Sequence, residues 1–471
     1  MARSSVVILV ADGVRPDTLA AAMSAGEVPA LARLSADGGL HVVTSVFPSV
    51  TGPAYTPFLM GRYPGPVGLP GIRWYDRAAS ASALLPRARS YVGSEFRKVD
   101  RDLDPLAPTL FELSSSNLAA LSVIGRGLQP RDREGHTLGF ALRAARVHFS
   151  GDVRGWLAID RDIGARVARR IRAERPQVAF CALTGIDKTS HAEGHDAPVV
   201  RDALRTVDET TAQIRDDAER DGRWDAMHLW IVSDHGHSPV RAHEDLAGLI
   251  HSWKLGVIAH PWIYGAGRDV AVMVSGNAMA HLYLELDSRA RTRAAWPSLE
   301  KKWAWLAERL LERESVDLLL IPLEGHTCEV RARGRGRALV EMEGGRYSYR
   351  PLTGDPLAIG AHESLSHDEA YAVTVSSDYP DAIVQIAHLA GSARSGEIML
   401  SASRNWDYRA KWEPIPHVSS HGALHREHMQ VPLLLNRRVS GVPRRTVDVM
   451  PSALCAIGAA VPNGLDGRSY L

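Results

Sequence analysis

Short, largely apolar runs that stop at an acidic residue are the feature that most constrains the fold of this chain. The three clearest runs, with the acids that follow them, are Val6–Ala11 before Asp12, Val178–Leu183 before Asp187, and Leu229–Ser233 before Asp234. Runs of this length that contain β-branched and aromatic residues are typical of strands buried on both faces of a parallel sheet. Each strand would then place a carboxylate at its carboxyl end.

Helical patterns separate these runs. They cover Pro16–Met23, Ala30–Ser35, Asp160–Arg175 and Val200–Glu219. An alternation of strands and helices predicts a mostly parallel sheet with helices on both faces. Because such sheets bind ligands outside the carboxyl ends of their strands, we expect the three acids to share one site.

Composition excludes several classes of protein. The 471 residues are 45% hydrophobic, enough for a sizeable core, and a net charge of +1 gives no overall field for binding a nucleic-acid polymer or an anionic membrane. The apolar runs are far shorter than the roughly 20 residues of a membrane span, and the first is shorter than the core of a signal peptide, about 7 residues. Cys181, Cys328 and Cys455 are odd in number and far apart. We therefore expect reduced, buried thiols and a cytoplasmic protein.

The later part of the chain is less regular. Within residues 325–400, Ala338–Glu343 and Tyr371–Ser376 are expected as strands of a small antiparallel lobe. The chain then returns to the core with an expected strand at Gln430–Leu435 and a closing helix at Thr446–Ile457. The predicted fold class is α/β, a mostly parallel, doubly wound sheet flanked by helices. Residues 1–471 would form a single domain with a small β lobe inserted at about 325–400.

The same strand ends carry histidines as well as acids. Asp187 lies four residues before His191, Asp234 directly precedes His235, and His421 lies in a polar loop before the last strand. Oxygen and nitrogen ligands of this kind suit zinc, and manganese or iron with less preference. Each residue taken singly is more often a cap or a hydrogen-bonded side chain. Together with Asp12 they supply three carboxylates and three imidazoles, which is enough for two metal ions.

A metal pair of this kind needs a nucleophile, and Thr51 is the candidate. It lies in the segment Phe47–Tyr55, between residues that can open a helix. Coordination by a metal lowers the pKa of a hydroxyl by several units and makes the alkoxide available near neutral pH. The amide of Gly52 would then be placed to bind a phosphoryl oxygen. A simple helix N-cap is an equally good interpretation of Thr51 from spacing.

The order of these motifs resembles the alkaline phosphatase superfamily, and most closely its type I phosphodiesterase/nucleotide pyrophosphatase branch. The motifs are Asp12, Phe-Pro-x-x-Thr at 47–51, Asp187 with His191, Asp234-His235-Gly236, and His421-Gly422. The resemblance implies an alkaline phosphatase-like catalytic domain with two zinc ions. It assigns one ion to Asp187, His191 and His421, and the other to Asp12, Asp234, His235 and Thr51. His421 is preferred to His425 and His428 because Gly follows the last histidine in the family.

The resemblance also implies a double displacement. Thr51 attacks phosphorus, a phosphothreonine forms, and water hydrolyses it. The chain departs from the family in two places: Gly71–Asp76 lacks the usual Asn that touches a phosphoryl oxygen, and Val50 replaces the usual Lys before the nucleophile. Arg73 can supply a bidentate phosphate contact in place of the Asn, and a surface Arg whose stem lies on Trp74 is as good an interpretation.

These observations lead to a hydrolase of small-molecule phosphoesters as the expected function, with a phosphodiesterase or nucleotide pyrophosphatase first. A phosphonate hydrolase similar to phosphonoacetate hydrolase, and a phosphomonoesterase, are the alternatives within the superfamily. Sulfatases share the fold, but Thr51–Tyr55 lacks their Cys or Ser and their Arg. Phosphoethanolamine-type transferases normally carry membrane helices. A metal-stabilised binding protein without catalysis is the alternative outside the enzymes.

Overall fold

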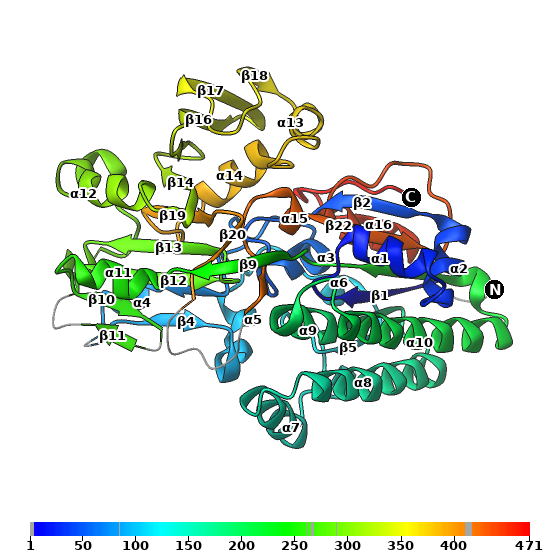
Figure 1. Cartoon of the computed structure of the whole chain (residues 1–471). Helices are drawn as coiled ribbons and strands as arrows, with labels where there is room; N and C mark the ends of the chain where they lie inside the picture. The colour runs from blue at the N-terminus through cyan, green and yellow to red at the C-terminus, as the bar shows by residue number, and fades with distance from the viewer. Residues whose placement is uncertain (1–3, 84, 261, 265–267, 289, 410–416) are drawn as a thin grey trace.

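The chain folds around two β-sheets that lie side by side (Figure 1). The computed structural model describes residues 4–83, 85–260, 262–264, 268–288, 290–409 and 417–471. Among these residues, no helix combines the length and the apolar character that crossing a membrane requires. The first sheet holds the chain's acidic strand ends, and the second, larger sheet is formed mostly by the middle of the sequence.

The first sheet has seven strands in the order β2-β22-β8-β1-β7-β5-β6. Their bounds are Leu40–Thr44, Gln430–Leu435, Met227–Val232, Ser5–Ala11, Val178–Leu183, Asn117–Ala120 and Arg133–Glu134, in that order. Strand β22 pairs antiparallel with both β8 and β2, and the other pairings in the sheet are parallel. The predicted mostly parallel sheet is confirmed, with β8, β1 and β7 as neighbours at its centre.

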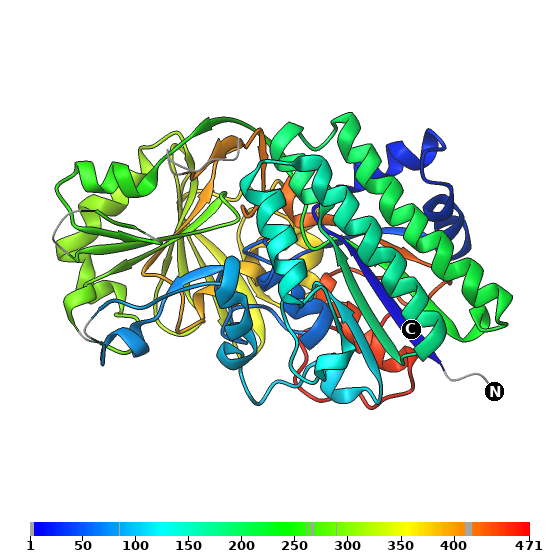
Figure 2. The same ribbon diagram turned by 90° about the horizontal axis from the view of Figure 1, so that it is seen from below.

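Helices cover both faces of this sheet. Alternate residues of β1 point to opposite faces: Ile8 packs with residues of α3 (Thr56–Met60), α6 (Leu110–Leu113) and α16 (Val449–Ala456), and Leu9 packs with residues of the helices on the other face. Those helices are α1 (Pro16–Ser24), α2 (Pro29–Gly38), α8 (Val153–Glu174) and α10 (Pro198–Arg220). Figure 2 shows the long helices α8 and α10 lying along each other over the sheet. The predicted helices are thus present, with ends shifted by up to three residues, except that α8 begins seven residues before the predicted start at Asp160.

The second sheet has ten strands in the order β11-β10-β12-β13-β19-β14-β15-β16-β17-β18. Their bounds, in that order, are Trp262–Tyr264, Val257–Ala259, Val270–Ser275, Met279–Leu284, Ile398–Ala402, Val316–Pro322, Cys328–Ala332, Gly336–Glu343, Arg346–Gly354 and His362–Leu365. All neighbours pair antiparallel except β10 and β12. Helices α11 (Leu246–Ser252) and α12 (Trp296–Leu311) cover one face, and α14 (Ala382–Ala390) covers the other.

The separate antiparallel sheet is larger than the small lobe expected at 325–400, because it also includes strands from 257 to 322 and β19. The division of residues 1–471 into one domain with an insertion stays a prediction. One predicted strand is wrong: Tyr371–Ser376 overlaps helix α13 (His367–Thr374). The reason is a capping box, in which the Ser366 hydroxyl accepts from the Glu369 amide and the Glu369 carboxylate accepts from the Ser366 amide.

The three cysteines are free thiols, as expected. Cys181 lies in β7 and Cys328 in β15, and both are buried. The expectation of burial is wrong for Cys455, which is exposed near the end of α16. A short helix that closes a sheet buries one side and leaves the other to solvent, so not every apolar position on it is covered.

Candidate active site

The three acids meet at the centre of the first sheet. Residue pairs Val10–Val232 and Ala11–Leu183 lie opposite each other, so that β8, β1 and β7 end almost level. Asp12 and Asp234 directly follow or nearly follow their strands, and Asp187 lies in the first turn of α9 (Gly185–Glu193). All three carboxylates are buried. The strand register therefore brings together acids that are up to 222 positions apart in the chain.

Helix α9 presents two donors on one face. Residues four apart on a helix lie one above the other, and His191 Nε2 is 3.2 Å from Asp187 Oδ1. A hydrogen bond from α8 holds the first residue of the helix. The Gly185 amide donates to the buried carboxylate of Asp160 on α8 at 2.6 Å. The position of this buried side chain thus determines where the Asp187 carboxylate lies.

His421 reaches the site through a small ribbon. Strand β9 (Ser238–His243) starts just after Asp234 and His235 and pairs antiparallel with β21 (Ser419–Ser420), which directly precedes His421. His421 Nε2 consequently lies 3.4 Å from Asp187 Oδ1. Its ring stacks on that of His235, with 3.6 Å between ring centroids. The pairing partner of a two-residue strand leaves no local signal in a sequence, so this closeness could not be derived from spacing.

Thr51 lies at the same place. Its Oγ1 is 3.2 Å from Asp234 Oδ2, 3.3 Å from Asp12 Oδ1 and 3.4 Å from His235 Nε2. The loop that carries Thr51 is tied to the other donors, since the carbonyl of Ser49 lies 2.9 Å from His421 Nδ1. Thr51 is partly buried, whereas the acids and His235 around it are almost fully buried.

His237 joins the cluster although the sequence interpretation missed it. It follows His235 by two residues, and its Nε2 lies 3.0 Å from Asp187 Oδ1. The available signal was the run Asp234-His235-Gly236-His237, in which residues two apart in extended chain share a face. His425 and His428 lie elsewhere: His425 contacts Glu427, and His428 contacts the Ser238 hydroxyl.

Burial and mutual repulsion perturb the titration of these groups. Burial, together with the nearby Asp12 carboxylate, raises the pKa of Asp234 to about 8. Burial opposes a charge on His235, but Asp234 and Asp12 raise its pKa to about 9. Burial also acts against the charged form of Asp187, but Lys188 and His191 hold its pKa well below the ordinary range. Buried acids packed this closely are stable in their charged form only with positive charge among them.

The chemistry of the donor set fits divalent metal ions. Two groups of residues have ligand atoms that all lie within 4.8 Å of one another: Asp187, His191, His237 and His421, and Asp12, Asp187 and His235. His235 Nδ1 lies 3.2 Å from the Gly236 carbonyl and Nε2 lies 3.3 Å from Asp12 Oδ1. Nε2 is therefore the nitrogen that faces the acids, and it could bind a cation there after giving up its proton.

Gly52 and Arg73 were the expected substrate contacts. Gly52 follows Thr51 directly and has φ +99°, a backbone conformation that favours glycine, and a Cβ built there would meet no atom within 4 Å. Arg73 begins β3 (Arg73–Tyr75), where it pairs with Ser90 of β4 (Ala88–Ser90). Contacts of either residue with a phosphoryl group stay predictions.

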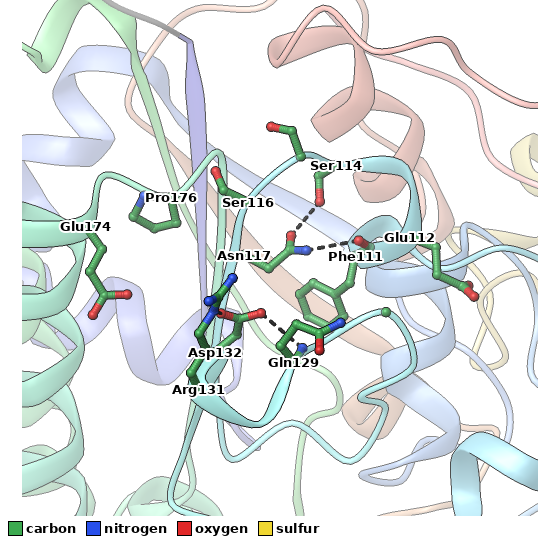
Figure 3. Close-up of a pocket in the computed structure, with 12 residues that line it drawn as sticks. Phe111, Glu112, Ser114, Ser116, Asn117, Gln129, Arg131, Asp132, Glu174 and Pro176 are labelled. Carbon is green, nitrogen blue, oxygen red and sulfur yellow. Dashed lines mark hydrogen bonds and ion pairs between the residues drawn. The ribbon is translucent and has the colours of Figure 1, made fainter.

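A cavity of about 400 Å³ lies at the other end of the sheet. Figure 3 shows Asn117 and Pro176 among its lining residues, at the amino ends of β5 and β7, opposite the ends that carry the acids. The Asn117 side chain is engaged there by Ser114 and by the Phe111 carbonyl. This cavity is therefore distinct from the cluster around Thr51.

A mostly parallel α/β sheet, with clustered carboxylates and imidazoles at its carboxyl edge beside a threonine, is the arrangement that the resemblance of the motifs to the alkaline phosphatase superfamily predicts. The sequence model of the family described as type I phosphodiesterase / nucleotide pyrophosphatase matches residues 6–425, and the chain belongs to this family. Membership indicates a phosphoester hydrolase. No curated protein matches the sequence at a significant level.

Solved structures agree on the fold. The phosphonoacetate hydrolase from Sinorhizobium meliloti 1021, in complex with phosphonoformate, is similar with a TM-score of 0.58 and 17% identity, over 98% of this chain and 96% of that chain. Human ectonucleotide pyrophosphatase / phosphodiesterase 5 gives a TM-score of 0.58 and 14% identity, over 98% of this chain and 97% of that one. The murine protein in complex with AMP gives 0.57 and 13%, over 99% and 98%. At these identities the likeness shows the fold.

Proposed function

We propose that this chain is a metal-dependent phosphodiesterase that uses Thr51 as its nucleophile and passes through a phosphothreonine intermediate. The observation that carries the proposal is the place of the Thr51 hydroxyl, 3.2–3.4 Å from donor atoms of Asp12, Asp234 and His235. An N-cap hydroxyl bonds backbone amides, whereas the contacts described for this hydroxyl go to side chains. These contacts favour the nucleophile over the cap.

The donors are proposed to hold two cations. Asp187, His191 and His421 would bind one, and Asp12, Asp234 and His235 would bind the other together with Thr51. When bound, two divalent ions, Zn²⁺ or else Mn²⁺ or Fe, supply charge that offsets the phosphoryl oxygens and lowers the pKa of the hydroxyl. The buried acids and the direction of His235 Nε2 toward Asp12 support this assignment.

The side chains of the site orient the Thr51 hydroxyl and can accept its proton. The Thr51 hydroxyl donates to Asp234 Oδ2, the nearest of its acceptors, so this carboxylate is placed to receive the proton as Oγ1 bonds to phosphorus. The bond from phosphorus to the leaving-group oxygen breaks in the same step. Water then cleaves the bond between Thr51 and phosphorus, which releases the phosphomonoester and restores the hydroxyl.

Lys188 adds positive charge beside Asp187. Its Nζ lies 2.8 Å from Asp187 Oδ2, and although burial opposes the charge, Asp187 and Asp12 raise the pKa of the ammonium. A cation that stays charged beside the proposed metal ligands suits an anionic substrate. Small phosphodiesters, including nucleotide pyrophosphates, are the proposed substrate class.

A substrate panel tests this proposal. Wild-type protein loaded with Zn²⁺ is compared on bis-p-nitrophenyl phosphate, p-nitrophenyl phosphate and phosphonoacetate. We expect the diester to be hydrolysed fastest. A faster monoester or phosphonate would instead favour a phosphomonoesterase or a phosphonate hydrolase, and bound metal without turnover of any substrate would favour a binding protein.

The nucleophile is tested by Thr51→Ala, with Thr51→Ser as the matched control that keeps a hydroxyl. We expect Thr51→Ala to keep its metal content and to lose about 10³-fold or more in kcat, as loss of a nucleophile does in other covalent mechanisms. Acid quenching of wild type during turnover of bis-p-nitrophenyl phosphate should trap, by mass spectrometry, a phosphothreonine at residue 51 that still carries one p-nitrophenyl ester. Wild-type turnover by Thr51→Ala would contradict the assignment.

A further inference from the structure

Three imidazole nitrogens converge on one carboxylate oxygen. The Nε2 atoms of His237, His191 and His421 lie 3.0, 3.2 and 3.4 Å from Asp187 Oδ1. The His237 side chain is 0% exposed. Whether these nitrogens can bind a metal depends on which nitrogen of each ring carries the proton.

The contacts of Nδ1 locate one proton on each of two of the three histidines. His191 Nδ1 lies 2.9 Å from the Ser419 carbonyl, and His421 Nδ1 lies 2.9 Å from the Ser49 carbonyl. A carbonyl oxygen only accepts hydrogen bonds, so each Nδ1 must carry the proton. Each Nε2 is then the nitrogen that faces Asp187, and it would bind a metal there after giving up any proton of its own.

For His237, the proton on Nδ1 follows from the hydrogen bonds of the Ser419 hydroxyl. Its Nδ1 lies 3.2 Å from the Ser419 hydroxyl oxygen, and that hydroxyl donates its own proton to the Ser238 carbonyl at 3.0 Å. The Ser419 oxygen is therefore left to accept, so His237 Nδ1 is the donor. His237 Nε2 is the third ring nitrogen that faces Asp187 Oδ1, at 3.0 Å, in a buried site.

We propose that His237 is a direct ligand of the cation at Asp187, which would then have four protein donors: Asp187, His191, His237 and His421. This inference rests on the proposed two-metal function and adds a donor to it. Room for the ring comes from Gly13, where a Cβ would lie 2.9 Å from His237 Nε2. The Cβ atom of any other residue at position 13 would collide with the His237 ring.

A fourth protein donor has a chemical consequence. Catalytic zinc sites usually have three protein ligands and keep a position open for substrate, whereas four ligands complete a tetrahedron. A cation held by four protein donors must become five-coordinate to bind a phosphoryl oxygen. The Asp187 site is therefore expected to accept Mn²⁺, Fe²⁺ or Co²⁺, which take higher coordination readily, at least as well as Zn²⁺ in turnover.

The direct test is a crystal structure of the Zn²⁺-loaded wild-type protein with anomalous scattering at the zinc edge. We expect His237 Nε2 at about 2.1 Å from the ion beside Asp187, the usual zinc–imidazole distance. If the ion is bound by Asp187, His191 and His421 and His237 Nε2 lies too far from it to coordinate, the inference is overturned and the proposed function is left intact. Absence of metal from wild type at saturating zinc would overturn both.

A second measurement uses Co²⁺ and the variant His237→Gln. Water would replace the lost ligand, so the visible cobalt bands of this site should shift and lose intensity, and one of two Co²⁺ affinities should weaken at least about 10-fold. The matched control is His428→Gln, because His428 is equally buried and its ring nitrogens contact Ser238 and the Ala423 amide. An unchanged cobalt spectrum in folded His237→Gln would contradict the inference.

Discussion

At the scale of single residues, the site is built from groups that would repel one another without a counter-charge. Asp234 is 0% exposed, accepts from the Gly13 amide at 3.3 Å and from Thr51, and lies close to a second buried acid, Asp12. Burial raises its pKa to about 8. In the metal-free protein at pH 7 this carboxyl therefore keeps its proton.

Metal binding should consequently release protons. A carboxyl and an imidazolium must both lose a proton to bind a cation. At pH 7 the cation therefore displaces protons from Asp234 and His235, and apparent affinity rises with pH until it levels off above about pH 9. Titration calorimetry with Zn²⁺ in two buffers of different ionisation enthalpy measures this release. Equal heats in both buffers at pH 7 would contradict the prediction.

Removal of the same side chain should remove the ion. Asp234→Ala is expected to lose one of two bound metals and nearly all activity, because the ion at Thr51 would keep only two protein donors besides the hydroxyl. Metal analysis after dialysis measures the loss. The matched control is Asp216→Ala, which removes an exposed acid on α10 and should keep both metals.

Site residues could be predicted from the sequence where they follow a buried strand or lie one turn apart on a helix. Asp12 and Asp234 end apolar strands, and Asp187 and His191 have helical spacing. His237 could not be assigned from local spacing, because its place depends on a distant part of the chain. Only the pairing of β9 with β21 places His237 opposite the Ser419 hydroxyl that orients it, and this contact joins residues 182 positions apart.

At the scale of elements, fully buried strands were predicted best. Strands β1 and β7 match the apolar runs within a residue, because a strand buried on both faces needs an unbroken apolar run. The second sheet could be predicted only in part. Its strand β13 pairs with β19, which is more than a hundred residues away, and a local pattern carries no information about such partners.

The start of helix α9 supplies a prediction at this scale. Burial raises the pKa of Asp160 to about 7. An acid whose folded pKa lies above its unfolded value stabilises the fold while protonated, and that contribution is lost as pH rises from the unfolded pKa through the folded one. Between pH 5 and pH 8 the loss would be about 3 kcal/mol, at 1.36 kcal/mol per pKa unit.

Asp160→Asn should therefore flatten the dependence of unfolding free energy on pH, because the amide oxygen still accepts from Gly185 but never ionises. Urea unfolding of metal-saturated protein at pH 5 and pH 8 measures the difference. Asp162→Asn is the control on the same helix, since Asp162 is 53% exposed and pairs with Arg143. An identical pH slope for wild type and Asp160→Asn would refute the role of Asp160.

At the scale of the whole molecule, the second sheet supports the loop that carries Thr51. Helix α14 covers that sheet, and its Gln385 accepts from the Phe47 amide at 2.9 Å and donates to the Ser45 carbonyl at 3.3 Å. The Gln385 amide also donates to Asp381 at 2.8 Å, just before the helix. The nucleophile is thus held in place by a helix of the neighbouring sheet, so the two sheets act as one framework for the site.

The ion pair of Asp381 with Arg445 fixes this framework to the C-terminal segment. The guanidinium makes two bonds to the carboxylate, at 2.9 and 2.7 Å, with exposures of only 2% and 0%. Arg445→Met leaves Asp381 buried without its partner, so we expect the free energy of unfolding to fall by about 3–5 kcal/mol. In Arg444→Met, which removes a half-exposed pair with Asp368, the change should stay within about 1 kcal/mol. Urea denaturation of both variants makes the comparison, and equal losses would show that the buried pair does not couple the two parts of the molecule.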